Sequence, residues 1–390
     1  MVSIATAEQA LKSYYLGTLN EILDFKVNPF LAMIEKSTRN IVGKDVRMTV
    51  KNGVNGGIGA GTETGNLPVS GGNNYSVLTT SLKNLYGTIE ITDKAIRASQ
   101  NNEGAFVDLL NAEMEGVVRS SVFNFGRMLF GDGTGMLAIV QGVNSSIITV
   151  DSVANLQVGM IVDFRTSNGE EIAGANARTI TQIDYDGKTI CVSGTAITST
   201  TCPAGTLIFM QGSYGLELTG LKAIFDMKRT ELYGLNRAEH SWLNPVVKER
   251  ETVDDIFIQQ CMDEVEMRCG SKVDVILCSP GVRRALMARP CELKAYLNTL
   301  SAEVGYTELS VNGIPVIADR FCPEGTMYLL NSKDFALHQL CDWQWLEDED
   351  GRVLKQIAGK AAYTATLVKY ADLVCSRPCG QVMIQGITES

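Results

Sequence analysis

The sequence has 390 residues, enough for two or three domains with a substantial core. It is 45% apolar and 20% charged, as ordinary soluble proteins are, and its net charge of −10 argues against electrostatic binding of nucleic acid. The 10 cysteines are scattered, and no run reaches the ~20 apolar residues that cross a bilayer. Met1–Gln9 lacks a basic region followed by an apolar core, so we expect no signal peptide. We therefore expect a protein of a reducing cytoplasm that does not contact a membrane.

Residues 1–45 are expected to form an amino-terminal arm. Ala7–Phe25 carries apolar side chains at helical spacing, and Asn28-Pro29 should end that helix. Phe30–Ile34 and Lys44–Lys51 are expected to be arm and strand material. Because the segment is short for a domain of its own, we expect it to be an arm that packs elsewhere.

Residues 46–99 predict an extended loop built on two strands. Val46–Val50 and Leu78–Ile91 alternate like strands, whereas Asn52–Asn74 between them has no aromatic residue and can bury little apolar surface. An isolated hairpin is marginal in water, so we expect this projection to rest on another chain. Thr62 stands where a dinucleotide-binding loop needs its third glycine, which argues against a nucleotide site. The flexible tip is expected to depend on eight glycines: Gly53, Gly56, Gly57, Gly59, Gly61, Gly65, Gly71 and Gly72.

Residues 100–142 contain a long helix, predicted over Glu103–Phe130. Apolar side chains from Val107 to Leu129 recur every three or four residues and therefore share one face. Asn101 and Asn102 can cap its start. At 1.5 Å per residue the helix would be about 42 Å long, which is long for a globular domain. This length indicates that another extended element lies along it.

Residues 143–212 predict a separate all-β module. Its β-branched runs are divided by turn signals such as Asn168-Gly169 and Asp186-Gly187, a pattern typical of a small barrel or sandwich. Glycine-rich segments on both sides indicate an insertion. The expected strands are Ile147–Val150, Met160–Phe164, Arg178–Ile183, Thr189–Val192 and Thr206–Phe209.

Residues 213–318 predict an α/β unit in which helices alternate with strands. Leu221–Tyr233 suits a first helix, and Thr252 is placed to cap a second one that Gly270 should end. Val273–Cys278 is a nearly continuous apolar strand, as expected where both faces of a sheet are covered. Ser279-Pro280 should open the helix that follows it.

Residues 319–390 predict a strand-rich return. Small and apolar residues alternate from Ala361 to Cys375, and Thr364, Thr366 and Asp372 lie at the other positions. At ~3.3 Å per residue this strand would span about 50 Å, close to the length of the helix. We therefore expect the long helix to lie along a long antiparallel sheet. Just before this region, Asn312-Gly313 predicts a hairpin.

Catalytic, cofactor and metal sites are not expected. His240 and His338 are the only histidines, and neither belongs to a nucleophile or metal motif. The acidic run before Gly351 does not fit a calcium loop, because Leu346 and Ile357 stand where ligands belong. The run is expected to form a solvated hairpin turn, with a cation held between subunits as the alternative.

The order of these parts resembles the major capsid proteins of tailed double-stranded DNA phages, which share the Hong Kong 97-type fold. Three segments carry the local resemblance: Leu85–Ser99 (LYGTIEITDKAIRAS), Phe130–Thr134 (FGDGT) and Asn312–Asp319 (NGIPVIAD). The resemblance implies an α+β fold with an extended β-hairpin loop (E-loop) over 46–99 and a spine helix in a peripheral domain over 100–142 and 319–390. It also implies an α/β axial domain over 213–318 and an inserted small all-β domain over 143–212.

The resemblance further implies a structural protein that assembles with itself into hexamers and pentamers. These would form the icosahedral shell of a virion, built in the host cytoplasm, around DNA that is enclosed but not specifically bound. Separate scaffolding, portal and decoration proteins would be its partners. Because no Lys lies between Asn52 and Leu82, we expect no isopeptide cross-link through the tip. The residues expected at subunit interfaces are Arg47, Lys51, Glu63, Lys83 and Glu90.

Two other classes of protein are alternatives. An encapsulin-like bacterial nanocompartment shell would share the fold but enclose a protein cargo. A β-rich carbohydrate-binding protein would need aromatic platforms on the β module, whose aromatic residues are Phe164, Tyr185 and Phe209.

Overall fold

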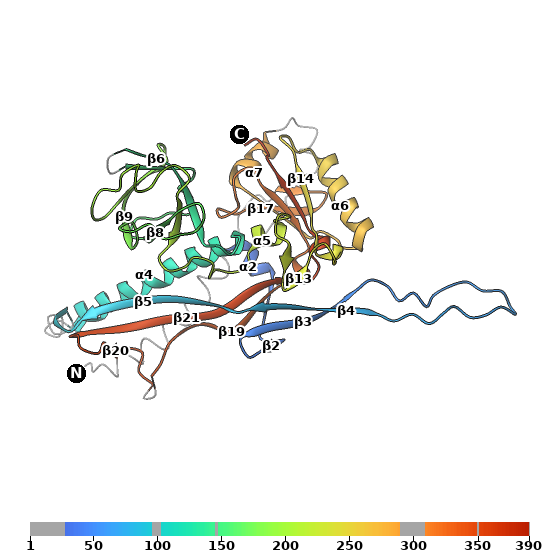
Figure 1. Cartoon of the computed structure of the whole chain (residues 1–390), viewed down its shortest axis with the longest axis horizontal. Helices are drawn as coiled ribbons and strands as arrows, with labels where there is room; N and C mark the ends of the chain where they lie inside the picture. The colour runs from blue at the N-terminus through green and yellow to red at the C-terminus, as the bar shows by residue number, and fades with distance from the viewer. Residues whose placement is uncertain (1–27, 96–102, 145–146, 289–308, 349–350, 390) are drawn as a thin grey trace.

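The computed structural model describes residues 28–95, 103–144, 147–288, 309–348 and 351–389, with side chains of the long helix described from residue 112 onward. The helix expected over Ala7–Phe25 and the caps expected at Asn101 and Asn102 lie outside these ranges. Figure 1 shows a long base of strands, a barrel above one end, an α/β unit above the other and a projecting hairpin. None of the described helices combines the length and apolarity that crossing a bilayer demands.

A long helix lies along a long antiparallel sheet at the base, as predicted (Figure 1). Helix α4 (Glu103–Phe130) has the predicted bounds and contacts β5 (Lys83–Thr92). Strand β5 pairs with β21 (Ala362–Cys375), whose other edge pairs with β19 (Phe335–Trp345). The sheet is completed by β1 (Glu35–Ser37), parallel to β19, and by β20 (Lys355–Gln356).

The carboxyl-terminal part of β21 is buried on both faces. Lys369 is 1% exposed and Asp372 is 0% exposed. Helix α4 covers one face, where Phe125 lies 5.2 Å from the Lys369 ammonium. The other face is covered at Asp372 by residues that hydrogen-bond to its carboxyl group, Thr80 and Thr219.

Most of the segment Phe30–Ile34, expected as arm and strand material, belongs to a short helix, and Ile34 after it is extended. Helix α2 (Pro29–Met33) has Pro29 in its first turn, where the missing N–H leaves no hydrogen bond unmade. The helix places Phe30 in the main core, with ring centroids 6.2 Å from Phe130 and 5.5 Å from Phe335. Burial of this aromatic side chain therefore fixes residues 29–33 against the body.

The expected all-β module is a closed barrel with a hydrophobic core of its own. Its strand order is β10-β7-β6-β11-β8-β9, which decides between the barrel and the sandwich in favour of the barrel. The first strand was not among those expected, and it begins before residue 143. The strands are β6 (Met136–Asn144), β7 (Ile147–Val150), β8 (Ile161–Arg165), β9 (Arg178–Asp184), β10 (Thr189–Val192) and β11 (Leu207–Met210).

The α/β unit is built on a six-stranded sheet of order β14-β22-β18-β15-β17-β16. As predicted, Gly270 ends one flanking helix, Ser279 caps the other, and Val311 pairs with Ile314 across the Asn312-Gly313 turn. The elements are α6 (Asp255–Cys269), α7 (Pro280–Met287), β14 (Val246–Glu249), β15 (Val275–Cys278), β16 (Leu309–Val311), β17 (Ile314–Ala318), β18 (Met327–Leu330) and β22 (Val382–Gln385). Short 3-10 turns are η1 (Ser241–Leu243), η3 (Ser332–Asp334) and η4 (Pro378–Gly380).

Two expected helix boundaries in this unit are corrected. The helix expected over Leu221–Tyr233 ends early as α5 (Leu221–Phe225), because the Asp226 carboxylate accepts the backbone N–H of Lys228 at 2.9 Å and turns the chain. The chain then forms the hairpin of β12 (Glu231–Leu232) and β13 (Leu235–Asn236). Asp254, and not Thr252, caps α6, since its Oδ1 accepts the N–H of Phe257 at 2.7 Å.

Candidate assembly surface

A two-stranded hairpin projects from the body (Figure 1). Strands β3 (Asp45–Asn52) and β4 (Asn74–Ser81) pair along their whole lengths, and β2 (Ile41–Val42) pairs with β3. The run expected as one strand over Leu78–Ile91 is divided at Leu82, because β4 and β5 belong to different sheets. The hairpin and the base sheet are therefore two separate sheets that meet at this residue.

The tip of the hairpin, residues 53–73, brings two chain branches together. A Cβ on Gly71 would lie 2.5 Å from the backbone N of Gly57, so only glycine permits this approach. The tip also presents four aliphatic side chains that are at least 83% exposed: Val54, Ile58, Leu67 and Val69. Clustered exposed apolar side chains are typical of surfaces that bind another protein.

The root of the hairpin is fixed to β21 by a buried carboxyl group. Asp372 Oδ2 accepts the Thr80 hydroxyl at 2.6 Å and the Thr219 hydroxyl at 3.1 Å, and its Oδ1 accepts the N–H of Thr219 at 2.7 Å. Burial raises the pKa of this carboxyl, and the hydrogen bonds from Thr80 and Thr219 act in the opposite direction. Asp372 thus joins β4, β21 and the chain before α5 at one point.

A second connection at the root passes through Tyr233. Its backbone carbonyl accepts the N–H of Thr79 at 2.9 Å. Its buried hydroxyl donates to the carbonyl of Leu373 at 3.2 Å and accepts the N–H of Cys375 at 3.1 Å. The connections through Asp372 and Tyr233 fix the position of the root of the hairpin on the body.

A buried ion pair joins α4 to the chain that leaves the barrel. Arg127 donates to both carboxylate oxygens of Glu217 at 2.5 and 2.9 Å, and both side chains are less than 5% exposed. Near it, a groove of about 970 Å³ runs between the barrel, α4 and β5. Its apolar lining includes Leu82, Tyr86 and Val117.

The residues expected at interfaces lie on three different parts of the molecule. Arg47 and Lys51 are exposed on β3, and Glu63 is exposed in the tip. Lys83 and Glu90 lie on β5, where Glu90 is 3.8 Å from the Lys360 ammonium of the same chain. The structure therefore places the five residues on two strands and the tip and does not bring them together, and the interface role of all five stays a prediction.

The two histidines make contacts within the fold. His338 is buried with Nδ1 3.1 Å from the carbonyl of Arg39, and burial lowers its pKa. His240 packs edge-on against Trp242 with ring centroids 6.3 Å apart. The structure groups no three metal-ligating side chains within the ranges it describes. The expected acidic turn lies partly outside those ranges, since residues 349–350 are not described.

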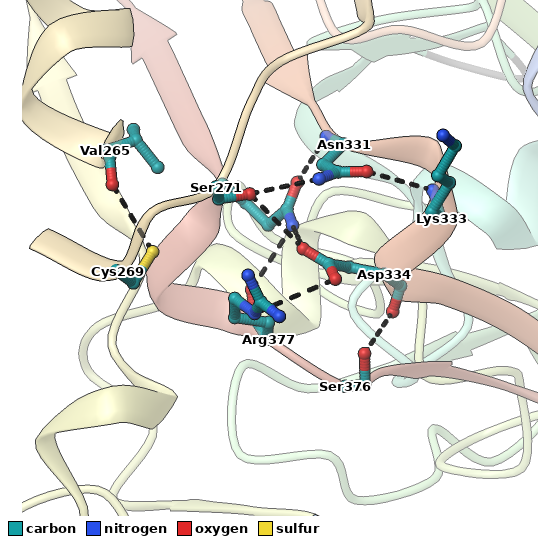
Figure 2. A network of polar contacts seen from close by, with 9 residues as sticks. Val265, Cys269, Ser271, Asn331, Lys333, Asp334, Ser376 and Arg377 are labelled. Atoms are coloured by element: carbon teal, nitrogen blue, oxygen red, sulfur yellow. Dashed lines mark hydrogen bonds and ion pairs between the residues drawn. The ribbon is translucent and has the colours of Figure 1, made fainter. Parts of the chain in front are cut away.

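A polar network that the sequence did not predict ties the α/β unit to the end of β21 (Figure 2). Asp334 Oδ2 accepts the Gln381 amide at 3.0 Å and the Ser271 hydroxyl at 3.4 Å, and its Oδ1 lies 3.9 Å from Arg377 Nε. Ser271 Oγ also accepts the amide of Asn331 at 3.2 Å. These residues are far apart in the sequence and belong to no motif, so no local signal could have identified them.

The chain is similar in structure to solved phage capsid chains. It matches a chain of the cyanophage A-1(L) capsid asymmetric unit with a TM-score of 0.56 and 12% identity, over 93% of both chains. A capsid of a native GTA particle matches with a TM-score of 0.48 and 10% identity, over 92% of this chain and 89% of that one. Mycobacterium phage Adephagia matches with a TM-score of 0.46 and 9% identity, over 94% and 91%. No protein-family model and no curated protein sequence matches this chain. The cyanophage match shows a shared fold.

Proposed function

We propose that this chain is the major capsid protein of a tailed double-stranded DNA phage, with the Hong Kong 97-type fold. One observation carries the proposal: the likeness to the cyanophage capsid chain extends over 93% of both chains. A match of that extent takes in most of both chains. Folds host several functions, so the experiment below tests the function directly.

In this proposal the hairpin with its tip is the E-loop, within residues 46–99. Helix α4 is the spine of the peripheral domain, the barrel is the inserted domain, and the α/β unit is the axial domain. The subunit forms hexamers and pentamers, which are rings of head-to-tail contacts. A ring of either size needs one element that adapts, and the glycine-rich tip with its exposed aliphatic side chains suits that role.

The root of the hairpin supports this role because it is held firmly on the body. The Asp372 and Tyr233 connections hold β4 on the body. A force applied at the tip is therefore transmitted through these hydrogen bonds to β21. The tip adapts and the root stays fixed. A contact of this kind lets one chain occupy unequal positions in a closed shell.

The partners in this proposal are other copies of the chain, a separate scaffolding protein, a portal and decoration proteins. The DNA is enclosed and not specifically bound, which agrees with the net charge of −10. The protein catalyses no reaction, and its site of action is the virion. The exposed charges Arg47, Lys51 and Glu63 are proposed to lie at interfaces between copies.

Electron microscopy of the expressed protein tests the proposal. We expect rings, tubes or shells, and we expect particles purified from an infected or induced host to contain nuclease-protected double-stranded DNA. Shells that contain a protein cargo and no DNA would indicate the nanocompartment alternative. A monomer that binds glycans and forms no particles, with or without a co-expressed scaffold, would contradict the proposal.

A further inference from the structure

Two partly exposed cysteines, Cys269 and Cys379, lie side by side where α6 meets η4. Cys269 is the last residue of α6, and its thiol donates to the carbonyl of Val265 at 3.4 Å (Figure 2). Cys379 lies in the turn between β21 and β22. More than a hundred residues separate them in the sequence, so the fold itself creates the pair.

The segments that carry the two thiols are packed closely. A Cβ on Gly380, next to Cys379, would lie 2.7 Å from Ser271 Oγ, two residues beyond Cys269. Asp334 binds both segments, through Ser271 on one side and Arg377 on the other (Figure 2). This network keeps the two cysteines adjacent as long as the α/β unit is folded.

Both thiols are accessible from a cavity. Cys269 and Cys379 line a space of about 790 Å³ between the hairpin strand β3 and the α/β unit. This volume accommodates a peptide-sized reagent. The buried cysteines Cys278 and Cys322 differ in this respect, since they are 0% and 5% exposed.

We propose that Cys269 and Cys379 are a redox-active pair that closes into an intrachain disulfide when the protein meets a small-molecule disulfide such as oxidised glutathione. In the first step the Cys269 thiolate attacks one sulfur of the reagent, which forms a mixed disulfide and releases one glutathione thiolate. In the second step Cys379 gives its proton to water and its sulfur attacks Cys269 Sγ, which releases the second glutathione. The two protein thiols lose two electrons, and the reagent gains them.

The order of the two steps follows from the environment of Cys379. Burial, with the neighbouring Cys269 as the next cause, raises the pKa of Cys379 to about 12. A thiol that holds its proton so tightly reacts slowly with an external reagent, but it can resolve a mixed disulfide formed beside it. Cys269 is therefore the first nucleophile and Cys379 the resolving thiol.

The disulfide would stabilise the folded chain. It closes a loop of more than a hundred residues, and long loops lose the most unfolded-state entropy when they are cross-linked. We expect Tm to rise by about 5 °C on oxidation and to return on reduction. The inference concerns the single chain and does not depend on the proposed function.

The test uses the purified full-length protein, incubated with oxidised glutathione at about pH 8. We expect the loss of two free thiols per chain, a peptide pair that links Cys269 to Cys379 in mass spectrometry after alkylation, and the rise in Tm. Glutathione adducts that persist on both cysteines, links between other cysteines, or no loss of thiols would each overturn the proposal. This readout needs only the wild-type protein.

Variants separate the roles of the two thiols. Cys379→Ser should trap one glutathione on Cys269, and Cys269→Ser should leave Cys379 unmodified. Neither variant should show the rise in Tm. Cys341→Ser, at another partly exposed cysteine, is the matched control and should behave as the wild type. If Cys379→Ser traps no glutathione while the wild type still oxidises, the assigned order of attack is wrong.

Discussion

Asp319 is a buried carboxyl group with one satisfied oxygen. Its Oδ1 accepts the N–H of Phe321 at 2.9 Å, whereas Oδ2 has no hydrogen-bond partner among the described residues. Burial raises the pKa of Asp319 to about 6 from 3.8. The native state therefore holds this proton more tightly than the unfolded state does. The contribution of this proton to the free energy of unfolding is fully present below about pH 4, and it is lost as the pH rises through 6.

Asp319→Asn should remove this pH dependence, because the amide oxygen can still accept from Phe321 and no charge forms. Raising a pKa from 3.8 to about 6 corresponds to ~3 kcal/mol. We expect the free energy of unfolding of the wild type to fall by about that amount relative to the variant between pH 4 and pH 8. Urea unfolding of the unassembled protein across this range measures the difference. Parallel curves for the two proteins would show that Asp319 does not titrate in this window.

The burial of individual polar side chains is the feature that the sequence pattern predicted least well. The alternating pattern showed only that Asp372 lies opposite the small and apolar residues of its strand, and its partners Thr80 and Thr219 come from distant parts of the chain and enclose it completely. Lys369 is enclosed in the same way, and its ammonium lies 2.5 Å from Asp342 and 2.7 Å from the Gln339 amide oxygen. Periodicity reports which residues share a face. It does not report what covers that face.

Among the elements, α4 was predictable because its apolar side chains repeat over many turns, and each turn adds independent support. The caps at Ser279 and Gly270 were predictable from local backbone chemistry. Helix α5 was not, since a single hydrogen bond from the Lys228 backbone N–H to the Asp226 carboxylate ends it after Phe225. Short elements carry too few residues for a pattern to outweigh one such contact.

Two glycines in α4 test how closely the helix is packed. Gly126 has no room for a side chain, because a Cβ would overlap Asn28 Oδ1 and the Phe321 ring. Both neighbours are less than 10% exposed and cannot move aside easily. Gly126→Ala should therefore destabilise the protein by about 1–3 kcal/mol, even though alanine favours the helix by up to ~1 kcal/mol.

Gly116→Ala is the matched control in the same helix. A Cβ there meets no atom within 4 Å among the described residues, so only the helix propensity changes. We expect this variant to be more stable than the wild type by up to ~1 kcal/mol. Thermal and urea unfolding of both variants measure the two effects. Equal changes at the two sites would contradict the packing of α4 against α2 and the segment around Phe321.

In the whole molecule, the aliphatic side chains of the tip are proposed to serve assembly, since they contribute little to the folding of the single chain. Four of its aliphatic side chains are 83–90% exposed, so they contribute little to the hydrophobic core of the single chain. Exposing apolar surface of this kind is unfavourable unless a partner covers it. The proposed assembly provides that partner as a second copy.

Replacing these four side chains by serine should leave folding intact and weaken assembly. We expect Tm to change by less than about 2 °C, because substitutions of exposed residues outside the core have small effects. We expect the concentration at which particles form to rise at least about tenfold, since each lost apolar contact between copies removes ~1 kcal/mol or more. The variant carries Val54→Ser, Ile58→Ser, Leu67→Ser and Val69→Ser.

The matched control changes four polar residues of the same tip and keeps its length and glycines. It carries Thr64→Ser, Asn66→Ser, Ser70→Ala and Asn73→Ser. Light scattering and electron microscopy over a concentration series compare both variants with the wild type. If the control assembles normally and the first variant does not, the aliphatic side chains make the contact between copies. If both assemble like the wild type, the hairpin strands or the body carry the contact, and the tip does not.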